Sequence, residues 1–89
     1  MKAIVTVVGK DRIGIIASVC SLLAGYQVNI LDISQTVMQG YFTMMMVVDV
    51  SASAVPVAEL AVCMEEMGKE KGLSIRLQRE DIFEAMHRI

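Results

Sequence analysis

The segment that most constrains the fold runs from Val7 to Val19 and reads Val-Val-Gly-Lys-Asp-Arg-Ile-Gly-Ile-Ile-Ala-Ser-Val. A strand rich in β-branched residues enters a glycine and a short charged turn, after which a helical pattern begins at Asp11. Such a helix start directs unpaired backbone N–H groups and the positive end of the helix dipole at the turn. Gly9 and Gly14 place no side chains there. The sequence therefore predicts a site for a small anionic group, such as a carboxylate.

The elements on either side of this turn are marked by their end residues. The first strand is expected over residues 2–8 and the helix over residues 12–24, with Asp11 as the N-cap and Gly25 as the glycine that ends it. The apolar stripe predicted for this helix consists of Ile13, Ile16, Ala17, Cys20, Leu23 and Ala24.

The next segment, residues 27–50, predicts a β-hairpin. Its apolar side chains change sides of the strand near Leu31, which indicates a bulge or a bend. Gln39-Gly40 then supplies a tight turn into a strand over residues 41–50. Because that strand is apolar on both sides, we expect it to be a central strand with both faces covered.

The second half of the chain predicts a helix, a strand and a short final helix. The second helix is expected to begin near Pro56, capped by Ser53, and to end at Gly72. Its apolar stripe consists of Val57, Leu60, Ala61, Met64 and Met67. Alternating apolar residues predict a fourth strand over residues 73–78. The final helix carries apolar side chains at Ile82, Phe83, Met86 and Ile89.

The order of these elements predicts an α+β domain. A βαββαβ order forms a ferredoxin-like sandwich, in which a four-stranded antiparallel sheet carries two helices on one face and has the first and third strands in its centre. We expect one domain over residues 1–89, with a core over 1–80 and a helical extension over 81–89. The second sheet face, to which we assign Val5, Val7, Met45 and Val47, then needs a cover from the C-terminal helix or from a partner sheet.

Composition predicts self-association and argues against nucleic acid binding. Of the 89 residues, 55% are hydrophobic and eight are methionine, which is more apolar material than a small two-layer monomer buries easily. The net charge is only −2, and the basic residues are scattered rather than clustered on one face. We therefore expect a homodimer or a higher homo-oligomer that has no direct nucleic acid contact.

The cysteines and the single histidine indicate no metal or thiol chemistry. Cys20 and Cys63 each fall on a predicted apolar stripe, so two free, buried thiols are favoured over a disulfide. With only His87 besides, no metal site and no cofactor are expected. Without a recognisable signal peptide or a membrane-spanning run, the chain is expected to be cytoplasmic.

Three functions of comparable folds fit this sequence poorly. An acylphosphatase-like enzyme needs a phosphate-binding loop with an arginine and an asparagine, for which Arg12 and Asn29 are available, but Asp11 would repel the phosphate. A metallochaperone needs a paired-cysteine loop where this chain has Lys-Asp-Arg. An RNA-recognition module needs exposed aromatic residues on the central strands, where valine and methionine stand instead.

The turn Gly9-Lys-Asp-Arg-Ile-Gly14, the helix after it and Val28-Asn-Ile30 resemble the corresponding parts of the ACT domain family. This likeness extends to about residue 80, and it is greatest for stand-alone bacterial ACT proteins and for the tandem ACT repressor of glycine cleavage. The resemblance implies a ligand between the first loop of one subunit and the second strand of its neighbour. Carried over by position, the ligand-binding residues are Asp11, Arg12, Ile13, Gly14, Asn29 and Ile30.

The resemblance implies a small-molecule regulatory domain, most simply one that senses an amino acid, and it implies no catalytic residue. Asp11 would receive the ligand ammonium, and backbone amides near Ile13 and Gly14 would bind its carboxylate. The alternative is a self-association or protein-interaction module without a ligand, and an acylphosphatase-like enzyme ranks third. Purely structural roles also remain open, since Asp11 can serve only as an N-cap and Asn29 only as a backbone partner.

Overall fold

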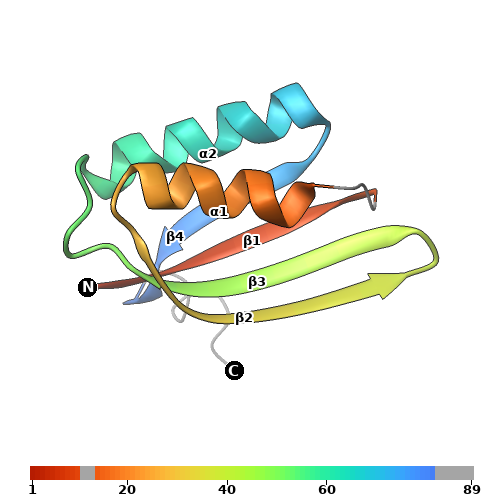
Figure 1. Ribbon diagram of the computed structural model, residues 1–89, viewed down its shortest axis with the longest axis horizontal. Coiled ribbons are helices and arrows are strands. Elements are labelled where there is room, and N and C mark those ends of the chain that lie inside the picture. The colour runs from red at the N-terminus through yellow and green to blue at the C-terminus, as the bar shows by residue number, and fades with distance from the viewer. Residues whose placement is uncertain (11–13, 82–89) are drawn as a thin grey trace.

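The computed structural model describes residues 1–10 and 14–81, so the expected C-terminal helix lies outside the described residues. The elements follow the predicted order of strands and helices (Figure 1). They are β1 (Lys2–Lys10), α1 (Ile15–Gly25), β2 (Asn29–Met38), β3 (Tyr41–Asp49), α2 (Val57–Lys71) and β4 (Ser74–Arg79).

The four strands form one antiparallel sheet in the order β2-β3-β1-β4. Both helices lie on the same face of this sheet, and the two strands β1 and β3 occupy its centre (Figure 1). The ferredoxin-like α+β fold expected from the sequence is therefore confirmed, as is the central position of the first and third strands.

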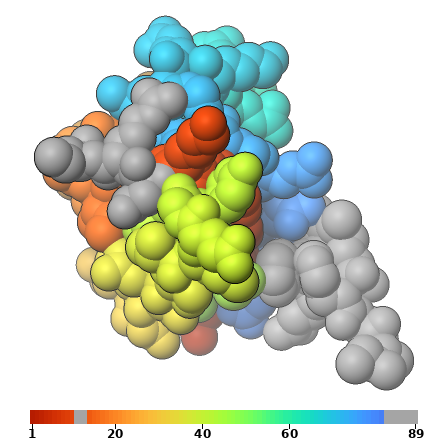
Figure 2. Space-filling view, turned by 90° about the vertical axis from the view of Figure 1, so that its right-hand side faces the viewer, coloured from red at the N-terminus to blue at the C-terminus, as the bar shows by residue number. Residues whose placement is uncertain are grey.

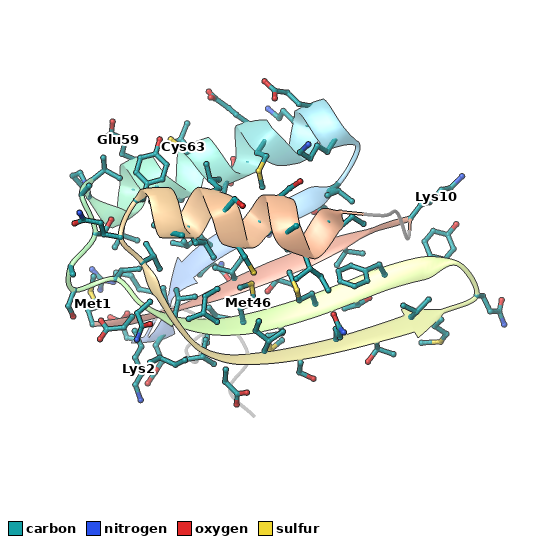
Figure 3. All side chains as sticks on the ribbon, viewed as in Figure 1. Met1, Lys2, Lys10, Met46, Glu59 and Cys63 are labelled. Atoms are coloured by element: carbon teal, nitrogen blue, oxygen red, sulfur yellow. The ribbon has the colours of Figure 1, made fainter. Side chains whose placement is uncertain are left out.

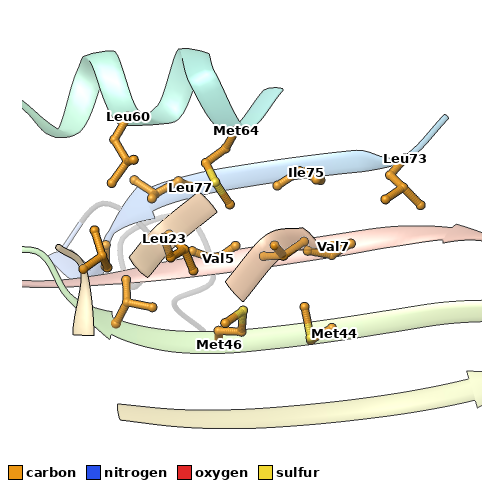
Figure 4. Close-up of a cluster of buried hydrophobic side chains, with 14 of the residues drawn as sticks. Val5, Val7, Leu23, Met44, Met46, Leu60, Met64, Leu73, Ile75 and Leu77 are labelled. Atoms are coloured by element: carbon orange, nitrogen blue, oxygen red, sulfur yellow. The ribbon is translucent and has the colours of Figure 1, made fainter. Parts of the chain in front are cut away.

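The core lies between the sheet and the two helices (Figure 4). Residues from both central strands, from β4 and from both helices are fully or almost fully buried in it; the largest fully buried side chains are Leu23, Met44, Met46, Leu60, Met64, Val5, Val7, Val19 and Val48. Methionine fills the middle of this layer because its unbranched side chain adapts to irregular gaps.

One assignment of strand faces made from the sequence was wrong. Val5 and Val7 were expected on the open face, but they pair with Met46 and Met44 and lie in the core under the helices. Partners in an antiparallel pair project from the same face, so the open face of β1 carries Ile4, Thr6 and Val8. Met45 was placed correctly and is 42% exposed.

The first helix is shorter than expected, and a different side of it faces the sheet. It begins at Ile15 with Gly14 at the N-cap position, rather than with Asp11 as the cap, and Asp11 itself lies outside the described residues. Its buried residues are Ile15, Val19 and Leu23, whereas Ile16 of the predicted stripe is exposed. Because this helix is apolar on several sides, its periodicity does not fix which side faces the sheet.

The residues that stand at the helix ends differ in part from those predicted. Gly25 is the last helical residue instead of the residue after the helix, and a positive φ of 62° falls on Gln27. Pro56, not Ser53, stands at the N-cap of α2, because the helix begins only at Val57. The Ser53 hydroxyl instead donates to the carbonyl oxygen of Val55 at 2.8 Å. Gly72 ends α2 in the left-handed conformation, as predicted.

The hairpin and its bulge are confirmed. The register between β2 and β3 shifts between Ile30 and Asp32, so Leu31 is the extra residue. Because of it, Ile30 and Ile33 project from the same, helix-facing side although their parity in the sequence differs. The turn at Gln39-Gly40 has positive φ values of 50° and 83° at its two residues, as a type I′ hairpin turn requires.

The cysteines are half-buried rather than buried, and both are free thiols. The Tyr26 hydroxyl lies 3.4 Å from the Cys63 Sγ (Figure 3). This hydrogen bond is the main cause of the raised pKa of the Tyr26 phenol. It joins the end of α1 to the middle of α2.

Candidate functional site

The start of α1 offers backbone N–H groups to a ligand. Gly14 has φ 88°, and its carbonyl accepts the first helical hydrogen bond from the Ser18 N–H at 2.9 Å. The amides that precede Ser18 in this turn therefore lack a partner within the helix. No side chain of the described residues caps this end, and the first turn contains no acidic residue. The dipole and the orphan amides together favour an anion here.

The two glycines that were expected to keep this turn open have different roles. A Cβ on Gly14 would meet nothing within 4 Å, so this position is open. A Cβ on Gly9 would lie 2.4 Å from the Cδ2 atom of Leu73. Gly9 therefore makes room for a core leucine, and only Gly14 leaves space for a ligand. The other loop residues predicted for the site, Asp11, Arg12 and Ile13, lie outside the described residues.

The strand residues predicted for the site lie on two faces of the sheet. Ile30 pairs with Val48, is half-buried and packs against the core cluster on the helix side. Asn29 is exposed at the first position of β2, and its partner in the register is Asp49. Asn29 and Ile30 are neighbours in the chain, but their side chains project from opposite faces of the sheet and so do not line one surface.

Asp49 is a charged neighbour of Asn29 that the sequence analysis missed. Hydrogen bonds from the side chain and the backbone N–H of Ser51 hold the pKa of Asp49 below its ordinary value. The N-terminal ammonium of Met1 lies 3.5 Å from the same carboxylate (Figure 3). A carboxylate that already pairs with the N-terminal ammonium therefore lies beside the start of β2.

The loop side and the strand side of the site lie at opposite ends of α1. The helix starts beside Gly14 and leads to the start of β2, as Figure 1 shows. An eleven-residue helix is about 16 Å long. One copy of the chain therefore does not bring Gly14 and Asn29 together.

An apolar surface formed by Ile16, Ile33 and Val37 extends along the β2 edge, and we call these three residues the β2 ledge. Ile33 and Val37 pair with the core residues Met46 and Phe42, so they project on the helix side, yet they are 41% and 55% exposed. Ile16 of α1 is also exposed. Figure 2 views the molecule from the hairpin end, where the start of α1 (orange) lies beside β2 (yellow). The two helices do not cover this part of the sheet.

Other features of the described residues carry little chemistry. A shallow hollow at the opposite sheet edge is lined by Glu65, Lys69, Leu73, Ser74, Ile75 and Arg76. No polar side chain in residues 1–10 and 14–81 is buried, and that part of the chain has no group of three or more potential metal-ligating side chains. Neither described helix has the length and apolarity needed to cross a membrane.

A family model for the ACT domain matches residues 2–78. The chain belongs to the ACT domain family. A UPF0237 protein of Clostridium acetobutylicum is 54% identical over 89 residues, which is 100% of each chain. A UPF0237 protein of Bifidobacterium longum is 51% identical over 88 residues, with 99% of this chain and 98% of that one covered. ACT domains are commonly small-molecule regulatory domains.

Solved structures agree with this membership. An ACT domain protein from Streptococcus pneumoniae has a TM-score of 0.82 and 47% identity, with 98% of each chain covered. A putative glycine cleavage system transcriptional repressor has a TM-score of 0.75 and 25% identity over 88% of this chain and 44% of that one. A formyltetrahydrofolate deformylase from Pseudomonas syringae, at 20% identity and a TM-score of 0.80, shares the fold alone, over 27% of its chain.

Two glycine substitutions test the geometry of the α1 start. Gly14→Ala forces a side chain into the left-handed conformation and should lower the free energy of unfolding by about 1–2 kcal/mol. Gly25→Ala is the matched control, because Gly25 is helical, has no atom within 4 Å of its would-be Cβ and should gain about 0.5 kcal/mol. Urea unfolding at one protein concentration measures both. Equal effects of the two substitutions would contradict the left-handed Gly14.

Proposed function

We propose that this chain is a non-enzymatic regulatory domain that binds an amino acid between two copies of itself. The observation that carries the proposal is the separation of the two half-sites within one chain. Gly14 and the orphan amides lie at one end of α1, and Asn29 and Ile30 lie beyond the other end. A second copy can supply the missing half.

A two-fold axis beside β2 brings the two halves together. If the β2 strands of two copies run antiparallel along their free edges, the start of one strand lies toward the hairpin end of the other. The α1 start lies at that hairpin end (Figure 2). Asn29 of the partner copy then approaches the turn before Gly14, and the same contact repeats on the other side of the axis.

The β2 ledge supports this mode of association. Ile16, Ile33 and Val37 are exposed beside β2, which is an edge strand of the sheet formed by the described residues of one copy. Pairing two edge strands satisfies the backbone groups of both, and it buries apolar surface at about 25 cal/mol per Å². The same surface also supports the alternative function, an association module that binds no ligand.

The chemistry of the two halves fits an amino acid. The helix start favours the ligand carboxylate, since no side chain of residues 1–10 and 14–81 caps its N–H groups. The ligand ammonium needs a negative partner, for which Asp11 on the loop side is available, since Asp49 near Asn29 already pairs with the N-terminal ammonium. Exposed apolar residues of the ledge would surround the ligand side chain. The proposed ligand-binding residues remain Asp11, Arg12, Ile13, Gly14, Asn29 and Ile30.

Binding is tested by a thermal-shift screen with the twenty amino acids and small metabolic acids. A ligand at 100 times its dissociation constant adds about 2.7 kcal/mol to the free energy of unfolding, which raises the midpoint by roughly 10–20 °C for a domain of this size. Asn29→Ala should abolish that rise, with little loss of stability in the free protein because Asn29 is exposed. Ser74→Ala, which also removes an exposed polar side chain at the first residue of a strand but at the opposite sheet edge, is the matched control and should keep the rise. If no compound stabilises the wild type, the association module is favoured.

Association through β2 is tested by a charged substitution on the ledge. Val37→Lys should convert the dimer into a monomer, because the buried ammonium would have no partner in the interface. Val62→Lys is the matched control on α2, since Val62 is 53% exposed against 55% for Val37. Sedimentation velocity at micromolar concentration measures both. A wild type that is monomeric throughout, or a dimer lost only in Val62→Lys, would exclude the β2 interface.

A further inference from the structure

The second edge of the sheet carries a hollow that the proposed function does not use. In the sheet formed by the described residues, β4 is the edge strand opposite β2, and α2 runs above it (Figure 4). The hollow between them has a volume of about 330 Å³ and is lined by Glu65, Lys69, Leu73, Ser74, Ile75 and Arg76. Leu73 and Ile75 are buried, whereas the other four residues are exposed. The hollow therefore has an apolar floor and a polar rim.

An edge strand beside a helix is an arrangement that accepts an added strand. The free side of an edge strand presents backbone N–H and C=O groups to any extended chain laid along it. Such a chain gains main-chain hydrogen bonds, and its successive side chains project to opposite sides of the sheet. At the β4 edge, every second side chain would then enter the hollow under the wall that α2 forms.

We propose that β4 binds an extended segment of a partner protein as a fifth strand of the sheet, with side chains of the segment in the hollow beside α2. The charges around the hollow select the segment. Among residues 1–10 and 14–81, Glu65, Lys69 and Arg76 form no ion pair with one another or with other residues. All three charges are therefore available to a partner.

The spacing of two of these charges matches an extended chain. Glu65 and Lys69 are four residues apart in α2, which places them on one side of the helix, about 6 Å apart along its axis. Residues that project from one side of a strand repeat every 6.8 Å or about that distance. Two helix-facing residues of the added strand can therefore face Glu65 and Lys69 at the same time.

The third charge faces the residue between these two. Arg76 is the register partner of Thr6, so it projects from the open face, away from α2. Because α2 turns directly into β4 at Gly72, Lys69 lies nearer the start of β4 than Glu65 does. A segment antiparallel to β4 passes Glu65 first. Its matching sequence is a basic residue followed by two acidic residues, which face Glu65, Arg76 and Lys69 in turn.

A second copy of this chain fits the β4 edge less well than a bare extended segment. The helix α2 packs closely on β4, since a Cβ on Gly68 would lie 2.7 Å from the carbonyl oxygen of Leu73. Two copies joined through their β4 strands would place two such helices above strands about 4.8 Å apart, whereas packed helices need about 8–10 Å. A segment without a covering helix meets no such obstacle.

Fluorescence anisotropy with the 89-residue chain tests the proposal. The probe is a labelled peptide of alternating threonine and valine around a central Lys-Asp-Glu triplet. Lys69→Glu and Arg76→Glu should each weaken its binding by about tenfold, because an attraction becomes a repulsion. Lys71→Glu is the matched control and should bind as the wild type does, since it makes the same change at an exposed α2 residue outside the hollow. A counterpart peptide with a central Glu-Lys-Lys triplet should bind the wild type weakly.

N-methylation of the peptide backbone distinguishes an added strand from a general attraction of charges. Alternate N–H groups of an added strand point at its neighbour. A methyl group on one peptide nitrogen should therefore abolish binding, and a methyl group on the next nitrogen should leave it intact. Equal effects at the two nitrogens would overturn the proposal, as would the absence of binding that depends on Lys69 and Arg76.

The variant Val37→Lys separates this proposal from the proposed function. It should bind the Lys-Asp-Glu peptide as tightly as the wild type does, whether or not the β2 dimer exists, because Val37 lies at the other edge of the sheet. Sedimentation velocity of the same variant tests the second copy as occupant. A dimer that persists in Val37→Lys and is lost on adding Arg76→Glu would assign the β4 edge to self-association and contradict the proposal.

Discussion

The burial of one sheet face by two helices is the constraint on which the rest of this structure depends. The helices cover the inner faces of β1, β3 and β4, where Val5, Met44 and Met46 are completely buried. The inner face of β2 beyond Ile30 is left out, since Ile33 and Val37 are 41% and 55% exposed although their partners on β3 are in the core. A small domain with so incomplete a cover has a physical reason to associate along that strand. Edge exposure, not an internal cavity, is therefore the feature that leads to the proposed binding site.

Much of the fold could be predicted from the sequence because local chemistry marks it. The change of sides near Leu31, the Gln39-Gly40 turn and the glycine after α2 each correspond to a feature of the structure. The side of β1 that faces the helices could not be predicted, since Ile4 and Val8 make the open side almost as apolar as the core side. The buried side of α1 was predicted wrongly for the same reason, because Ile15 and Ile16 are adjacent and only Ile15 is buried.

The candidate site was predictable in its parts but not in its geometry. A helix start close to Gly14 was predicted, but with Asp11 as its cap, whereas the structure has Gly14 at the N-cap position. The role of Gly9 depends on Leu73, which is remote in sequence. The distance between the turn and Asn29 appears only when the length and direction of α1 are known. A site divided in this way couples ligand binding to assembly. A ligand that contacts both copies stabilises the dimer over the monomer, and by the same linkage assembly raises ligand affinity.

Subunit complementation tests the divided site most directly. Asp11→Ala removes the loop half and Asn29→Ala removes the strand half, so each variant alone should not bind an amino acid that stabilises the wild type. After the two variants are mixed and exchange subunits, half of the dimers are mixed, and each mixed dimer contains one intact and one doubly defective site. Isothermal titration calorimetry should then recover about one quarter of the wild-type sites, at wild-type affinity. A mixture that binds no more ligand than either variant alone would contradict a site shared between two copies.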